Sequence, residues 1–244
     1  TAGRAAFYWG MGISQSTHGT DNALALTNLA LMTGHVGKPG TGLNPLRGQN
    51  NVQGCSDSGG LPNVFTAYQP VTNPDIRARF EQAWNTSLSP DPGLTVTEMV
   101  DEALLGKIKA MVVMGENPLR SEPNLSHAQH ALDALDFMVC LDIFVNETGE
   151  RADVILPTAS FAEKDGTFTN SDRRVQRVRQ ALPPVGNSRA DWQIICELAK
   201  RMETLLGVEQ GAGFDYPDAE AIWEEMRAVT PDFYGITYER LERE

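Results

Sequence analysis

The sequence predicts an α/β fold with a mostly parallel sheet that carries helices on both faces. Two observations favour this class. Short apolar runs of strand length alternate with longer segments in which apolar residues recur at helical spacing. Each apolar run also ends in small or polar residues, as strands do where they enter a loop.

The first strand and helix are predicted close to the start of the chain. The run AAFYWGMG (5–12) is apolar and ends in glycines, which is typical of a buried strand entering a loop. A helix is expected next, capped by Thr20 or Asp21 and continuing to Met32. Gly34 lies where a glycine commonly ends a helix.

The region between 43 and 95 shows little periodicity, apart from a helix expected near 74–84. Another helix is expected over 96–105, with Thr95 or Thr97 as its cap.

The second half of the chain shows the alternation most clearly. Strands are predicted in the runs IKAMVVMGENP (108–118), FMVCLDIFV (137–145) and ADVILPTAS (152–160). Helices are predicted over 125–135, about 190–206 and about 217–229. This order predicts βαβ units in a Rossmann-like sheet, whose ligand site lies beyond the carboxyl ends of the strands.

We expect three parts within the 244 residues: a strand, helix and loop region (1–70), a connecting helical segment (71–106) and a dinucleotide-binding α/β part (107–244). The chain begins without a methionine, and we interpret it as a piece of a longer protein.

Charge and hydropathy exclude several partners. The formal net charge of −12 argues against nucleic acid, which requires a basic face. No stretch approaches 18 consecutive apolar residues, so we expect no membrane span.

The three cysteines, Cys55, Cys140 and Cys196, are widely spaced and form no CxxC pair. Neither a zinc ribbon nor an iron–sulfur cluster can be built from local spacing. The pattern favours a reducing compartment and hence a cytoplasmic location, with Cys140 and Cys196 as small buried apolar side chains.

Familiar catalytic motifs are missing. The sequence has no GxGxxG, GxxxxGK[ST], GxSxG or HExxH motif. His127 and His130 are three apart on a predicted helix and could share a metal, but an exposed helix face is the favoured interpretation.

The stretch NPLRGQNNVQGCSDSGGLPN (44–63) is unusually rich in carboxamides and glycines, with one arginine. Asn and Gln both donate and accept hydrogen bonds, and glycine-rich backbone can approach a pyrophosphate closely. Together with the polar strand ends, this stretch predicts a nucleotide-like cofactor.

Ordered blocks over nearly the whole chain resemble the molybdopterin-guanine-dinucleotide oxidoreductases, and within them the catalytic (alpha) subunit of formate dehydrogenase. The blocks include WGMGISQSTHGTDN, LRGQNNVQGCSDSGGLPNV, MGENPLRSEPNLSHAQHALDALDFMVCLDIFVNETGERADVILPTASF and DWQIICELAKRM. The resemblance is weakest at 72–100 and 205–216. It implies that the chain is the central α/β fragment of such an enzyme.

The resemblance implies a molybdenum or tungsten ion held by two pterin guanine dinucleotides, with a 4Fe–4S cluster in the parent enzyme. In the family, a cysteine or selenocysteine beside a histidine completes the site. That segment, the iron–sulfur domain and the C-terminal cap domain have no match in this chain. We therefore expect the isolated chain to be inactive and to bind no cofactor.

By the same resemblance, Arg47 matches the family arginine that holds the formate carboxylate. A guanidinium keeps its charge at all working pH values and can bind a carboxylate bidentately. An alternative is that Arg47 pairs with a cofactor phosphate or with Asp57. The matching cofactor-binding positions are Met11, Gly12, Gln15, Gly48, Gln49, Asn117, Ser121, Asp142 and Asp191. Leu141 departs from the family, which often has a glutamine there.

Two other functions stay open: a nitrate reductase of the same fold, and a non-catalytic α/β scaffold or assembly module. Nitrate reductases usually carry a small or hydroxyl residue before the GQ pair, so Arg47 favours formate. The expected partners are formate, the rest of the parent polypeptide and electron-transfer subunits. The arginine-rich run 171–180 is expected to be an exposed or edge strand, or else an interface.

Overall fold

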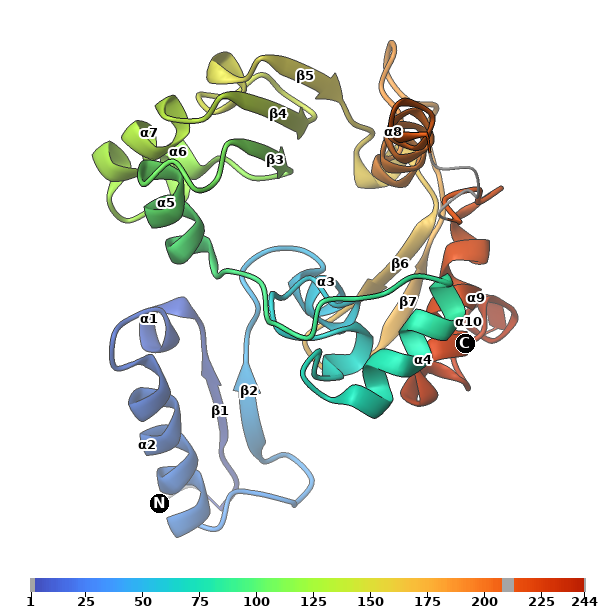
Figure 1. Cartoon of the computed structure of the whole chain (residues 1–244). Helices are drawn as coiled ribbons and strands as arrows, with labels where there is room; N and C mark the ends of the chain where they lie inside the picture. Colours follow the sequence, from blue (N-terminus) through green and yellow to red (C-terminus); the bar gives the residue numbers. More distant parts are fainter. Residues whose placement is uncertain (1–2, 208–212, 244) are drawn as a thin grey trace. The chain divides into compact units, whose positions relative to one another are not determined.

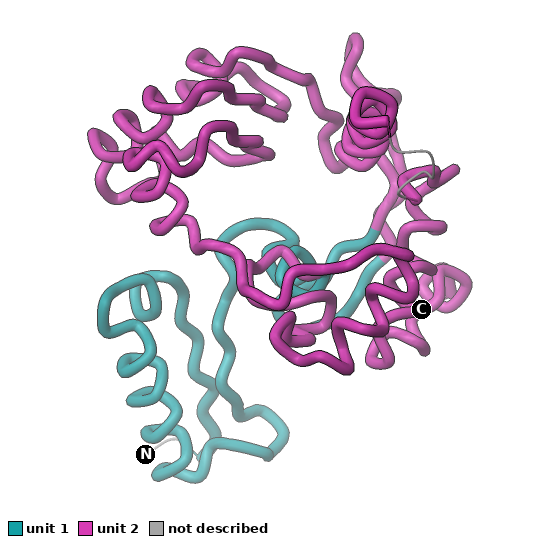
Figure 2. The backbone as a smooth tube through the Cα atoms, in the orientation of Figure 1, with its two compact units in different colours: residues 1–58, 167–176 teal, residues 59–166, 177–244 magenta. Residues whose placement is uncertain are grey.

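The computed structural model describes residues 3–207 and 213–243. These form two compact units, one made of 1–58 with 167–176 and the other of 59–166 with 177–244 (Figure 2). Each unit contains parallel strands and helices, which confirms the α/β class. The three sequence-based parts, with boundaries at 70 and 106, stay predictions.

The first unit is built on one pair of parallel strands, β1 (Ala6–Trp9) and β2 (Gly42–Pro45) (Figure 1). The crossover between the strands contains α1 (Met11–Ser14) and α2 (Gly19–Met32). The register pairs Trp9 with Pro45, so both strands end at the same level. After β2, the chain forms a loop and the short helix α3 (Val52–Asp57).

The start of α2 differs from the prediction that Thr20 or Asp21 caps it. The helix begins at Gly19, and neither predicted residue occupies the cap position. A Cβ atom on Gly19 would lie 1.8 Å from the carbonyl oxygen of Ser14, so the close approach of α1 requires glycine there. The predicted glycine end is confirmed, because Gly34 has φ 69°.

The second unit contains a three-stranded parallel sheet of β3 (Ala110–Met114), β4 (Phe137–Asp142) and β5 (Val154–Pro157), in chain order. The helices α6 (Pro118–Ser121) and α7 (Leu125–Asp133) connect β3 to β4. Val113, Leu132 and Met138 form the buried cluster between strands and helices.

The parallel strands form two separate sheets, and the edge strand β3 of the second sheet has one exposed apolar face. Val112 and Met114, which alternate with Val113 along β3, are 58% and 48% exposed. Leu141 of the central strand β4, which pairs with Met114, is 2% exposed, so this exposure belongs to the edge strand β3 and not to the whole face.

The remaining helices of the second unit agree with the sequence to within about two residues. They are α4 (Pro74–Trp84), α5 (Val96–Leu104), α8 (Asp191–Leu206) and α9 (Ala219–Val229). The short helix α10 (Tyr238–Arg243) follows them. Thr95, rather than Thr97, caps α5, and it forms a capping box with Glu98. The described part of the chain contains no helix that is both long and apolar enough to cross a membrane.

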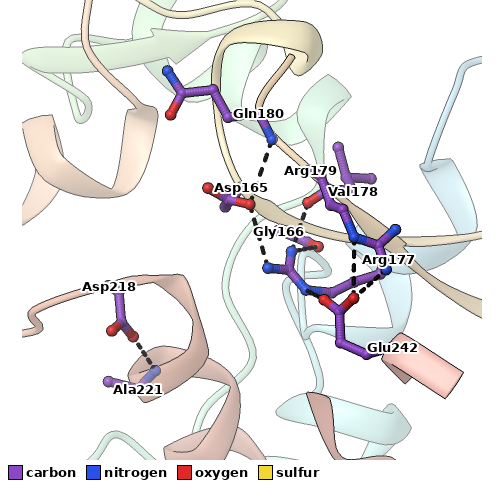
Figure 3. A network of polar contacts seen from close by, with 9 residues as sticks. All are labelled: Asp165, Gly166, Arg177, Val178, Arg179, Gln180, Asp218, Ala221 and Glu242. Carbon is purple, nitrogen blue, oxygen red and sulfur yellow. Dashed lines mark hydrogen bonds and ion pairs between the residues drawn. The ribbon is translucent and has the colours of Figure 1, made fainter. Parts of the chain in front are cut away.

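The arginine-rich run forms β7 (Val175–Val178), which pairs with β6 (Gly166–Thr169) in a two-stranded sheet, and the expected edge strand is confirmed. Glu242 of α10 lies between Arg177 and Arg179 (Figure 3). The Arg177 Nε atom is 3.1 Å from Glu242 Oε1. This contact is an ion pair, because the N–H bond does not point at the oxygen well enough for a hydrogen bond. The Arg177 guanidinium also lies 4.2 Å from the ring centre of Tyr238. These contacts attach the last helix to the base of the hairpin.

The structure confirms that Cys140 and Cys196 are buried, whereas Cys55 is exposed. Burial raises the pKa of the Cys140 thiol and that of the Cys196 thiol, and only the thiolate is reactive. We predict that iodoacetamide labels Cys55 in the folded chain and reaches the other two thiols only after unfolding in urea. Mass spectrometry of the labelled peptides measures this. A Cys55→Ser variant should stay unlabelled until it unfolds; native labelling of Cys140 at the Cys55 rate would contradict the burial.

Candidate functional site

The candidate site of the first unit lies where β1 and β2 end. The backbone N–H of Leu46 donates to the carbonyl of Trp9 at 2.7 Å, which continues the parallel pairing by one residue. The segments that follow the two strands therefore leave the sheet side by side. They surround a cavity of about 190 Å³ lined by Trp9, Gly10, Met11, Ser14, Pro45, Leu46, Arg47, Gly48, Gln49 and Val52.

Four of the predicted site residues line this cavity: Met11, Arg47, Gly48 and Gln49. A Cβ atom on Gly48 would lie 3.4 Å from Met11 Cε, which is van der Waals contact. The other two predicted residues of this unit, Gly12 and Gln15, lie in α1 and at its C-cap, outside the lining. Sequence reasoning thus identified four of the lining residues.

The side chain of Arg47 is exposed, and one edge of its guanidinium is already bound. Its Nε–H donates to Gln53 Oε1 at 3.2 Å, and Gln53 Nε2 donates to Asp57 Oδ1 at 2.7 Å. The proposed direct pairing of Arg47 with Asp57 is therefore replaced by a hydrogen-bonded chain through Gln53. Among the residues that the structure describes, none pairs with either Nη group of Arg47.

The loop that carries Arg47 is held at both ends by residues of the same unit, at the end of β6 and in the turn after it. The backbone N–H of Arg47 donates to Ser171 Oγ at 3.4 Å. At the other end, the buried Thr169 donates its backbone N–H to Asn51 Oδ1 at 2.9 Å. Asn51 has φ 61°, a left-handed conformation that asparagine tolerates better than most residues.

Gly54 leaves room for the Asn51 side chain. A Cβ atom on Gly54 would lie 2.0 Å from Asn51 Oδ1, the same oxygen that accepts the Thr169 N–H. A side chain at 54 would therefore displace the group that holds the loop to the hairpin.

In the second unit, three predicted residues lie at the carboxyl ends of neighbouring strands. Asn117 and Ser121 follow β3, and Asp142 is the last residue of β4. Asn117 Nδ2 donates to Glu147 Oε2 at 2.7 Å, and the hydroxyl of Thr148 donates to Asn117 Oδ1 at 2.7 Å. These contacts connect the loops after the two strands.

Ser121 and Asp142 are also engaged within these loops. The Ser121 hydroxyl lies 2.8 Å from Glu116 Oε1. Asp142 accepts the Ile143 N–H at 2.6 Å and the Asn146 Nδ2 group at 2.8 Å. Each oxygen has a second lone pair, so a ligand could still bind.

Asp191 makes its contacts with a different part of the second unit. It begins α8 and forms an ion pair with Lys164. The structure gives it no hydrogen bond or ion pair to Asn117, Ser121 or Asp142 within the described residues.

Sequence reasoning missed two strand-end carboxylates, Glu116 and Glu147. Hydrogen bonds from the Glu147 backbone N–H, then from Asn117 and from Arg120, lower the pKa of Glu147. The signal was available, because both glutamates lie in the loops GENP and NETG that follow β3 and β4.

The described residues contain no group of three or more His, Cys, Asp or Glu side chains that could hold a metal ion. His127 Nε2 instead lies 2.8 Å from Asp101 Oδ1, which makes it a link between α7 and α5. His130 is exposed, as the helix-face interpretation expects, whereas His127 is partly buried.

Parallel α/β units with glycine- and carboxamide-rich loops at the strand ends are typical of proteins that bind a polar ligand at those ends. The family model described as molybdopterin oxidoreductase matches residues 1–201, and the chain belongs to this family.

The chain is similar to named formate dehydrogenases. It is 52% identical over 241 residues to the F420-dependent formate dehydrogenase subunit alpha of Methanocaldococcus jannaschii, covering 98% of this chain and 34% of that protein. It is 42% identical to formate dehydrogenase H of Escherichia coli, and the match covers 97% of this chain and 32% of that protein. The chain thus spans about a third of the length of these relatives.

Among solved structures, the acetylene hydratase from Pelobacter acetylenicus is similar, with a TM-score of 0.50 and 21% identity over 69% of this chain and 23% of that one. This likeness shows the fold.

The bracing of the Arg47 loop gives a stability prediction. Gly54→Ala should lower the free energy of unfolding by about 1–3 kcal/mol, because the buried Thr169 N–H loses its acceptor. Urea unfolding of the chain measures this. The matched control is Gly12→Ala, since no atom lies within 4 Å of a Cβ there. Equal stability of both variants would show that Asn51 does not need the space at Gly54.

Proposed function

We propose that this chain is part of a formate dehydrogenase catalytic subunit, which oxidises formate to carbon dioxide at a molybdenum or tungsten bis(molybdopterin guanine dinucleotide) centre. The observation that carries the proposal is Arg47, whose two Nη groups are unpaired within the described residues and which lines a cavity at the strand ends. The names of the relatives support formate over nitrate as the substrate.

Arg47 would bind the formate carboxylate through both Nη groups. Because Nε already donates to Gln53, the substrate would approach the guanidinium end-on. Two parallel charged hydrogen bonds would fix both formate oxygens and so orient the C–H bond.

The residues around the cavity fit a pterin cofactor. Gly48 has no side chain, so the backbone there can approach a ligand closely. Gln15 and Gln49 have exposed carboxamides, which can both donate and accept. In the second unit, Asn117, Ser121 and Asp142 would contact a guanine dinucleotide. Gly12 of the first unit and Asp191 of the second would be further cofactor-binding residues.

Formate oxidation yields carbon dioxide, one proton and two electrons, and the bound metal–pterin group would accept the electrons. The residues of this chain would bind and orient the substrate and cofactor. The rest of the polypeptide would supply the cysteine or selenocysteine, the histidine and the 4Fe–4S cluster, and further subunits would receive the electrons. A cytoplasmic location is part of the proposal and is supported by three free cysteines.

Replacing Arg47 tests the substrate role. In the full-length enzyme, Arg47→Ala should lower kcat/KM for formate by about 100-fold or more, since each hydrogen bond between charged groups contributes about 1.5–3 kcal/mol. Steady-state kinetics at matched metal content measures the effect. Arg4→Ala, an exposed arginine outside the cavity lining, is the control. An unchanged kcat/KM in Arg47→Ala would remove this role.

The isolated chain should show no formate oxidation. It spans about a third of its relatives, so most of the contacts that would hold the cofactor lie elsewhere. An assay of purified chain with formate and an artificial electron acceptor, alongside metal analysis, measures this. Turnover above the level of a boiled control would overturn the expectation.

A further inference from the structure

We propose that Gln53, fixed in turn by Asp57, is a positioning residue that sets the direction of the Arg47 guanidinium and leaves its charge free to bind the substrate. The inference rests on the proposed function, in which Arg47 binds the formate carboxylate. It assigns a role to two residues that do not themselves face the substrate: Gln53 is absent from the cavity lining, and so is Asp57.

The geometry defines a relay on α3. Gln53 is 3% exposed, whereas the Arg47 side chain that it holds is exposed. Gln53 and Asp57 are four residues apart, which places them on the same side of the helix. A buried group therefore fixes one edge of a solvent-exposed cation.

The chemistry of the relay requires a carboxamide at position 53. The Arg47 Nε–H can only donate, and the Asp57 carboxylate can only accept. A side chain between them must accept on one side and donate on the other, and one orientation of the Gln53 amide satisfies both. The orientation is therefore set by the two neighbours.

The relay also keeps the positive charge available. A carboxylate placed directly on Arg47 would compete with the formate carboxylate for the same guanidinium. The neutral carbonyl of Gln53 binds the guanidinium without neutralising its charge. The negative charge of Asp57 is separated from Arg47 by the Gln53 side chain. Restricting the rotamers of a long side chain before binding lowers the entropy cost of binding.

The test compares two variants of the full-length enzyme that separate geometry from charge. Gln53→Leu removes the hydrogen bond to Nε and should raise KM for formate about tenfold, with kcat changed less than about threefold. The double variant Gln53→Glu/Asp57→Asn keeps both hydrogen bonds and the net charge but places the carboxylate directly on Arg47. Its KM should also rise about tenfold. A purely structural role for the relay predicts a normal KM in the double variant.

A cycle with Arg47→Ala separates this inference from the proposed function. If the relay acts through Arg47, Gln53→Leu should have no further effect on formate kcat/KM in the Arg47→Ala background. Normal kinetics in Arg47→Ala itself would overturn the proposed role of the arginine. A large effect of Arg47→Ala with normal KM in the double variant would overturn the relay alone. If Gln53→Leu does not fold, the double variant decides the question.

Discussion

The parallel pairing of β1 with β2 is the constraint on which the first unit depends. Its register places Trp9 beside Pro45, so the two loops that begin after these residues start from one edge of the sheet. A shift by one residue would turn the alternate side chains to the other face. The cavity and the position of Arg47 both follow from this pairing.

Side-chain hydrogen bonds then give the loop after β2 a defined shape. Asn51 reaches the backbone of the hairpin at Thr169, and the missing side chain of Gly54 makes this possible. Gln53 and Asp57 act on the other side of α3, toward the guanidinium. A stretch that is too polar for a protein core is thus ordered in part by the carboxamides of Asn51 and Gln53, each of which satisfies a specific partner.

The sequence predicted the strongly periodic elements well, because apolar spacing and caps are local signals. The helices α4 and α5 and the three strands of the second sheet all belong to this group. The sequence did not predict β2, which contains glycine, asparagine and proline and forms only because β1 is beside it. It also missed α3, whose six residues are too few for a periodic pattern.

The residues of the candidate site also divide into those that the sequence predicted and those that required the structure. Resemblance to a family identified Arg47, Gly48, Gln49 and Met11, and these four residues line one cavity. The part played by Gln53 depends on an i, i+4 pair in a helix that was not predicted, so it required the structure. The exposed apolar face of β3 likewise depends on which segments pack against it, and local sequence does not specify them.

The central claim is that Gln53 holds Arg47 with its Nη edge toward the substrate. A crystal structure of the full-length protein with bound formate tests it most directly. The account predicts both formate oxygens on the two Nη groups of Arg47, with Gln53 Oε1 still on Nε. An Arg47 side chain turned away to pair with a cofactor phosphate or with Asp57, and formate bound elsewhere, would contradict it.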